Sequence, residues 1–162
     1  MKLESGPIRL HFLVTPWLYA RIDRNLKTII LISCASRKAD RISKARDLYS
    51  SALFRLNLAY AEQLRPDAIY ILSAKHGLLA LDDKITPYNE TLNDMSTAQI
   101  RVWADRVHRQ LQAVTNVAAD RFIFLAGANY REYLAPRLPH HEVPLRGLPI
   151  GKQLQRLKKL TS

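Results

Sequence analysis

The chain has 162 residues, 48% of them hydrophobic and 24% charged, a composition that fits one folded domain and excludes a disordered chain. Its single cysteine excludes an internal disulfide, and no apolar run approaches the roughly 20 residues that a membrane helix needs. The formal net charge of +11 favours nucleic acid or a nucleotide as partner, with a solvated basic surface as the alternative. We expect a cytoplasmic protein without membrane contact, since a lone thiol suits a reducing compartment.

Residues 1–26 differ from the rest of the chain. Their apolar clusters, Phe12–Val14 and Pro16–Tyr19, have neither a helical nor an alternating period. A secretory signal is a poor fit, because no continuous apolar stretch leads to a small-residue cleavage site. We expect an N-terminal arm or extension here, and a single α/β domain over residues 27–162.

Three short apolar runs predict strands. Thr28–Ile32, Ala68–Leu72 and Arg121–Leu125 are rich in β-branched or aromatic residues and lack the alternation of a half-exposed strand. Such strands are buried on both faces of a sheet. A weaker run, Glu142–Pro144, predicts a fourth strand.

A helix is predicted after the first strand. Ser50 or Ser51 can cap its start, and Pro66 ends it after Arg65. Shorter helical patterns cover residues 129–134 and the C-terminal segment. The C-terminal helix carries Ile150, Leu154, Leu157 and Leu160 on one face, and the candidate nucleic-acid-binding residues Lys152, Arg156 and Lys159 on another.

The longest predicted helix opens with a capping-box pair, Ser96 and Gln99. Arg101, Asp105 and Arg109 follow at spacing four, so that they can pair with one another in solvent. We interpret this helix as structural, because its other face carries an apolar stripe of Ile100, Trp103, Val107, Leu111 and Val114.

The alternation of strands and helices predicts a three-layer α/β fold, with a mostly parallel sheet and helices on both faces. In such sheets, ligands bind outside the carboxyl ends of the strands, where the strand order reverses. This rule predicts that four loops meet there, namely residues 33–34, 73–77, 126–130 and 146–147.

Cys34 directly follows the first predicted strand. A cysteine there is a nucleophile when nearby cations stabilise its thiolate, and Lys38 and Lys75 are candidates to do so. The alternative is a small apolar residue that finishes a strand. Each lysine is either a nucleophilic amine or, as is more frequent, a charge that holds a phosphate. In the second case Arg146 would share the phosphates with Lys75.

His76 can act as a general acid or base, or it can simply cap a turn. Gly77 after it predicts a positive φ or a close backbone approach. Asn129 and Tyr130 can bond a base edge or stack on it. The catalytic candidates are Cys34, Lys38 and His76. The substrate-binding candidates are Ser33, Ser43, Ser73, Lys75, Gly77, Tyr88, Glu90, Asn129, Tyr130 and Arg146.

Several common motifs are absent from the sequence. It has no P-loop, no dinucleotide fingerprint, no Cys-x-x-Cys, no His-Glu-x-x-His and no Gly-x-Ser-x-Gly. The adjacent His140 and His141 cannot both ligate one metal from a strand, because successive side chains diverge. We therefore expect no metal and no cofactor.

The run Ile-Leu-Ser-Ala-Lys-His-Gly-Leu-Leu at residues 71–79, followed by Pro87-Tyr88, resembles the YaaA-like superfamily. Its members show Leu-Ser-x-x-Tyr/His-Gly-Leu followed by Pro-Tyr. The segments 48–50, 125–130 and 146–147 also match in order, so that the resemblance covers roughly residues 27–160. It implies a domain related to proteins associated with DNA binding and peroxide stress.

A more distant branch of that superfamily is the core of archaeosine synthase, which acts on a nitrile-bearing 7-deazaguanine base in transfer RNA. Its motif reads Pro-Cys-x-x-x-Lys-Pro-Tyr-x-x-Ser-x-x-His. Cys34, Lys38 and Ser43 fall at the matching spacing, whereas Ser33 replaces the first Pro. The Pro-Tyr pair and the His are replaced by Ala39, Asp40 and Arg46.

Three functions follow as hypotheses. The first is an enzyme that modifies a nucleobase or nucleotide in a pocket at the strand ends. The second is a non-catalytic DNA- or RNA-binding module that uses the basic C-terminal helix. The third is a binder of a small nucleotide ligand in the same pocket.

Overall fold

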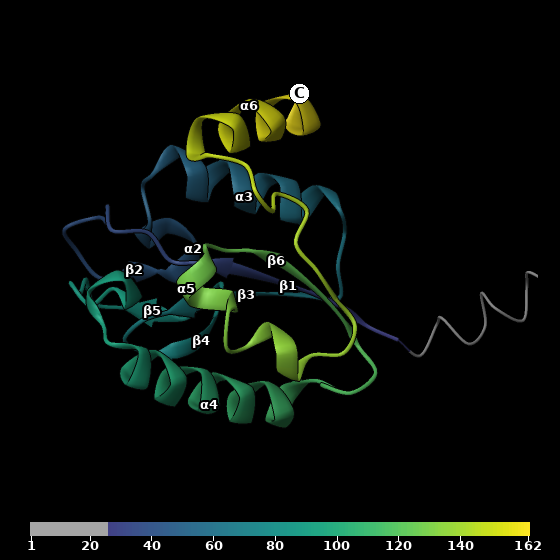
Figure 1. The fold of residues 1–162 in the computed structure, drawn as a ribbon. Coiled ribbons are helices and arrows are strands. Elements are labelled where there is room, and N and C mark those ends of the chain that lie inside the picture. Colours follow the sequence, from purple (N-terminus) through teal and green to yellow (C-terminus); the bar gives the residue numbers. More distant parts are fainter. Residues whose placement is uncertain (1–25) are drawn as a thin grey trace, which may run out of the picture.

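The computed structural model describes residues 26–162, so the predicted arm lies outside the described residues except for Leu26 (Figure 1). The strands are β1 (Thr28–Ser33), β2 (Ser43–Lys44), β3 (Ala68–Ser73), β4 (Gly77–Ala80), β5 (Lys84–Ile85), β6 (Arg121–Leu125) and β7 (His141–Glu142). The helices are α2 (Ala45–Leu48), α3 (Ala52–Gln63), α4 (Thr97–Val114), α5 (Ala128–Arg131) and α6 (Ile150–Thr161). Two single 3₁₀ turns are η2 (Leu92–Asp94) and η3 (Ala135–Arg137).

The main sheet has five strands in the order β4-β3-β1-β6-β7. β1 pairs in parallel with β3 and β6, and β6 pairs in parallel with β7, whereas β4 runs antiparallel to β3. The predicted mixed α/β chain with a mostly parallel sheet is thereby confirmed. β4 was not predicted, and neither was the small sheet of β2 and β5, whose two-residue strands are too short to show a period.

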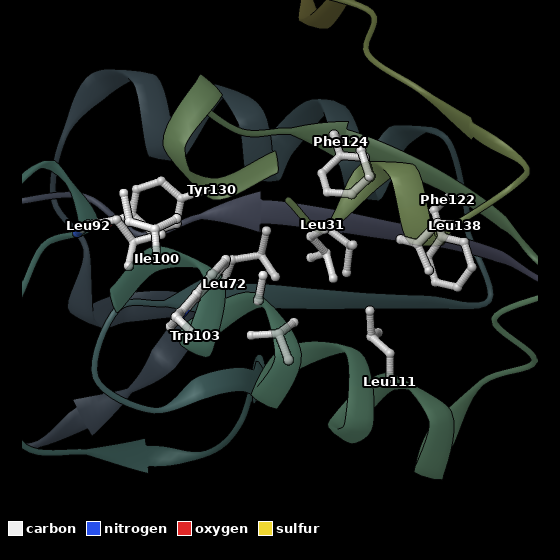
Figure 2. Packing of buried hydrophobic residues seen from close by; sticks show 14 of the residues in the cluster. Leu31, Leu72, Leu92, Ile100, Trp103, Leu111, Phe122, Phe124, Tyr130 and Leu138 are labelled. Carbon is white, nitrogen blue, oxygen red and sulfur yellow. The ribbon is translucent and has the colours of Figure 1, made fainter. Parts of the chain in front are cut away.

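Both faces of β1 are buried, which explains its continuous apolar sequence. Ile29 and Leu31 belong to one hydrophobic cluster, together with Trp103 of α4 and Phe124 of β6 (Figure 2). The alternate residues of β1 belong to a second cluster. That cluster includes Ile30, Ile32, Phe54 and Ala61 of α3, and Leu157 of α6.

The α4 helix begins at the predicted capping box, in which Ser96 and Gln99 bond each other's backbone N–H groups. The stripe is buried as far as Leu111, but Val114 is 49% exposed, so its predicted burial was wrong. Val114 closes the helix, beyond the part that packs on the sheet. Asp105 forms its ion pair with Arg137 rather than with its neighbours on the helix.

The predicted apolar face of α6 is only partly buried. Leu157 is completely buried, whereas Ile150 is 64% exposed and Leu160 is also exposed. The physical reason is that α6 packs on α3 and not on the sheet (Figure 1), so that only a narrow strip of the helix is covered. None of the helices within residues 26–162 is both long enough and apolar enough to cross a membrane.

The other helix and strand boundaries shift by a few residues. Ser51 caps α3 by accepting the backbone N–H of Phe54, as predicted. β7 begins at His141 rather than at Glu142, and α5 ends at Arg131 rather than at Leu134.

Candidate active site at the carboxyl ends of β1 and β6

The strand order reverses around β1. The chain passes from β1 through α3 to β3 on one side, and it later returns to β6 on the other side. Phe54 of α3 and Tyr130 of α5 lie in different hydrophobic clusters, so the helices that follow β1 and β6 leave toward opposite faces. A crevice is expected between the carboxyl ends of two such strands.

Two pockets meet in that crevice. The polar pocket, about 270 Å³, is lined by Cys34, Ser36, Lys38, Glu90, Asp94 and Tyr130, among others. The amide pocket, about 350 Å³, is lined by residues that include Cys34, Leu53, Asn57, Asn129, Tyr130 and Gln153. Cys34, Asn93 and Tyr130 line both pockets, so the thiol lies where the two spaces join.

The Cys34 thiol lies 3.3 Å from the hydroxyl oxygen of Tyr130. The same hydroxyl accepts the backbone N–H of Leu92 at 3.3 Å, which fixes its position. Burial, and next to it the charge of Cys34, raise the pKa of Tyr130 above its ordinary value of 10. The hydroxyl therefore keeps its proton at neutral pH and can donate it to the sulfur in a hydrogen bond.

Lys38 is held in the loop after β1 by backbone bonds to the segment before α3. The Ala39 N–H donates to the Leu48 carbonyl, and the Ser50 N–H donates to the Arg37 carbonyl. The ammonium nitrogen of Lys38 lies 4.5 Å from the centre of the Tyr88 ring, a cation–π contact. Burial lowers the pKa of Lys38, against the opposing effects of Cys34 and Glu90.

This shift predicts unusual reactivity of the Lys38 amine. In trace labelling with an amine reagent, Lys38 should reach half of its maximal rate at a lower pH than the free amino acid derivative Nα-acetyl-lysine amide, because more of its amine is unprotonated at any given pH. Mass spectrometry of the digested protein measures Lys38, with the derivative added to the same sample. A midpoint for Lys38 equal to or above that of the derivative would contradict the prediction.

The hydroxyl groups of Ser73, Tyr88 and Tyr49 form a buried hydrogen-bonded chain behind the polar pocket. Ser73 donates to the Tyr88 hydroxyl at 2.7 Å, and the Tyr88 hydroxyl is also bonded to that of Tyr49. Ser73 is completely buried, and its carbonyl accepts the indole N–H of Trp103 at 2.8 Å. Neither Ser73 nor Tyr88, both predicted to bind substrate, lines either pocket. They pack behind the polar pocket instead, where Tyr88 contacts Lys38.

The segment 73–77 forms a tight hairpin turn and not an open loop, because β4 pairs back onto β3 from Gly77. Gln110 of α4 accepts the Leu78 N–H and donates to the His76 carbonyl, and Arg106 donates to the Lys75 carbonyl. The helix that the sequence marked as structural therefore also clamps this turn.

The His76 ring packs edge-on against Tyr88, 5.4 Å between ring centres. Burial, followed by the charges of Lys75 and Arg106, lowers the pKa of His76. Lys75 is exposed and lines a groove against α4, of about 570 Å³, which shares Glu90 with the polar pocket. Neither Lys75 nor His76 lines the pockets that contain Cys34, so the four loops do not all contribute to one pocket.

Gly77 has φ +74° and is buried against α4, where an added Cβ would lie 2.2 Å from Oε1 of Gln110. Gly77→Ala should lower the free energy of unfolding by about 2 kcal/mol, from the left-handed backbone and the displaced Gln110. Urea denaturation measures this loss. Gly151→Ala in α6, where a Cβ meets nothing within 4 Å, should be neutral or stabilising, and equal losses at both positions would disprove the argument.

Residues 29–159 match the sequence model of DUF6884, a family of unknown function. The chain belongs to the DUF6884 family. The matched segment includes β1 from Ile29 onward, β6 and every residue named above as lining the two pockets. No curated protein shows a significant match to the chain.

The remaining predicted residues of this DUF6884 chain fall into two groups. Ser33 and Asn129 line the amide pocket, and Glu90 lines the polar pocket. Ser43 lies on β2, where its hydroxyl donates to the Arg41 carbonyl. Arg146 lines a different pocket, beside α5. Neither residue lines the two pockets that contain Cys34. The predicted phosphate pair, Lys75 and Arg146, does not share a pocket. The candidate cations of α6 are all exposed, namely Lys152, Arg156 and Lys159.

Of the uncharged amides in the amide pocket, only Asn129 was predicted from the sequence. Asn57, Asn93 and Gln153 all line the amide pocket, but none was a candidate. One signal was present for Asn57, which shares the buried face of α3 with Phe54 and Ala61. A polar residue on an apolar helix face needs a partner. Within the described residues, no cluster of three His, Cys, Asp or Glu side chains can hold a metal.

Proposed function

We propose that this protein is an enzyme that modifies a nucleobase or nucleotide, with Cys34 as the nucleophile. The observation that carries the proposal is the Cys34 thiol, which lines both pockets, is bonded to the Tyr130 hydroxyl and shares the polar pocket with Lys38, an amine of lowered pKa. A thiol, a hydrogen-bond donor and an amine are the groups that covalent catalysis needs. The basic net charge supports a substrate that carries phosphate.

The proposed reaction begins with attack of the Cys34 sulfur on an electrophilic carbon of the base. As the sulfur–carbon bond forms, the thiol proton passes to the amine form of Lys38, which the lowered pKa makes more abundant, and the electron pair of the attacked bond moves onto a nitrogen of the base. The Lys38 ammonium then gives its proton to that nitrogen. Tyr130 is a positioning residue, since its hydroxyl bonds the sulfur.

Comparison of nucleosides tests this proposal. Cells that lack the gene receive either the wild type or Cys34→Ala, and their digested RNA, DNA and free nucleotides are compared by mass spectrometry. We expect at least one nucleoside to change in amount with the wild type only. The same nucleoside profile with both proteins, each present and folded, would refute the enzyme.

The relationship to the YaaA-like superfamily, a three-layer arrangement of the domain and a cytoplasmic location are parts of the same proposal. The two hydrophobic clusters, one on each face of β1, support three layers. The match of Cys34, Lys38 and Ser43 to the spacing of the archaeosine synthase core supports the superfamily. Ser43 itself lines neither pocket, which argues for a different reaction.

A second candidate is a non-catalytic DNA- or RNA-binding module. The supporting observation is that α6 exposes Lys152, Arg156, Lys158 and Lys159 and contains no acidic residue. This function predicts binding that weakens steeply with salt and persists in Cys34→Ala. A third candidate is a binder of a small nucleotide, and mass spectrometry of copurifying small molecules would detect the ligand.

A further inference from the structure

Asn57 is a buried polar side chain without a partner. It lies on α3 among apolar neighbours and is only 4% exposed. Its Oδ1 atom accepts no hydrogen bond from any described residue. A buried carbonyl oxygen that has lost its water costs stability unless a donor replaces that water. Asn57 lines the amide pocket, and rotation of its amide group turns Oδ1 toward a ligand there, which can supply the missing donor.

The side chains of the amide pocket favour a neutral occupant. None of them carries a charge, in contrast to the polar pocket with Lys38, Glu90 and Asp94. A phosphate or carboxylate would meet no cationic side chain there, only the first turns of α5 and α6, whose residues Ala128 and Ile150 line the pocket. The volume of about 350 Å³ lies near the lower end of the roughly 300–1,000 Å³ typical of small-molecule sites.

The pocket also combines apolar walls with polar edges. Leu53, Leu125 and Ile150 supply apolar surface, and the amides supply hydrogen-bonding groups. Gln153 uses its N–H on the Leu148 carbonyl at 2.8 Å, which leaves its side-chain oxygen as an acceptor. A flat ring with N–H groups on its edge satisfies both requirements. A sugar satisfies them less well, because its ring is puckered and carries hydroxyl groups around its edge.

We propose that the amide pocket binds a neutral nucleobase and that Asn57 accepts a hydrogen bond from an N–H group on its edge. The inference rests on the proposed function and deepens it, since it identifies where the base lies relative to Cys34. Asparagine amides bond base edges in this way because they offer an acceptor and a donor side by side. The base would then lie beside the thiol that lines the same pocket.

Calorimetric titration of the full chain with small bases tests the inference. The probes are 9-methyladenine, 9-methylguanine and 1-methylcytosine, which carry N–H donors, and 9-methylpurine, which has none. We expect saturable binding of at least one of the first three. Asn57→Leu should weaken that binding at least about tenfold, because the acceptor is lost. 9-Methylpurine should bind weakly and equally to both proteins.

Asn57→Leu should melt at the same or a higher temperature without ligand, because an unpaired polar group is replaced by an apolar one of similar size. Asn57→Ser serves as the second variant if the leucine does not fold. The matched control is Asn116→Leu, at an exposed asparagine outside the pocket, which should leave base binding unchanged. The inference is overturned if no probe binds, if Asn57→Leu and Asn57→Ser bind as the wild type does, or if 9-methylpurine binds equally well.

The same titration on Cys34→Ala separates this inference from the proposed reaction. Base binding that persists there, with no Cys34-dependent product in cells, refutes the reaction and supports the pocket. A Cys34-dependent product without Asn57-dependent base binding refutes the pocket assignment alone.

Discussion

Cys34→Ala should lower the rate of base modification by about a thousandfold or more, since loss of a nucleophile typically removes most of an enzyme's rate enhancement. The effect on folding should be small, because Cys34 is only partly buried at the end of β1 and its backbone N–H still bonds the Leu72 carbonyl. The measurement is the initial rate of product formation by purified protein, once the nucleoside comparison has identified the product.

Two further variants sharpen this expectation. Tyr130→Phe removes the hydroxyl that lies 3.3 Å from the sulfur, and it should lower the rate by about tenfold while the thiol remains. Ser36→Ala changes an exposed residue of the polar pocket and should have little effect. A Cys34→Ala protein that retains the wild-type rate would show that the thiol has a structural part only.

Trp103→Ala should lower the free energy of unfolding by about 3–5 kcal/mol, the usual loss for a large aromatic side chain removed from a core. The indole is 4% exposed and packs edge-on against Tyr130, with ring centres 5.6 Å apart (Figure 2). Its N–H also bonds the Ser73 carbonyl, which the substitution leaves without a donor. The substitution should therefore weaken both the core and the turn at residues 73–77.

Denaturant unfolding followed by far-UV circular dichroism measures this loss. Val102→Ala is the matched control on the same helix, because Val102 is 67% exposed and its truncation should change stability by no more than about 0.5 kcal/mol. Similar losses for the two variants would contradict the packing described for α4. Without its edge-on contact to Trp103, Tyr130 should also hold the Cys34 sulfur less firmly.

The core strands and the helix starts were predictable because their signals are local. A run such as Thr28–Ile32 is apolar at every position, and that pattern suits only a strand covered on both faces. The capping box at Ser96 and the N-cap at Ser51 each depend on residues within three positions of one another. Local geometry alone is sufficient for such features.

The path of the chain at residues 73–77 depends on residues that are distant in the sequence. Nothing in Ser73 to Gly77 indicates whether the chain continues into a loop or turns back on β3. Gln110 and Arg106 decide this, because they bond the turn from a helix more than 30 residues away in sequence. Thus Lys75 and His76 line neither pocket that contains Cys34.

The sequence by itself determined that Cys34 directly follows a buried strand, and so that it lies at the edge of the sheet where ligands bind. Only the tertiary structure decided its neighbours: Tyr130 at its sulfur, Lys38 in one pocket and Asn57 in the other. The physical reason is the distance along the sequence between the residues that determine each feature. Strand burial follows from consecutive side chains, whereas these neighbours come from different loops and helices that meet only when the sheet brings β1 and β6 side by side.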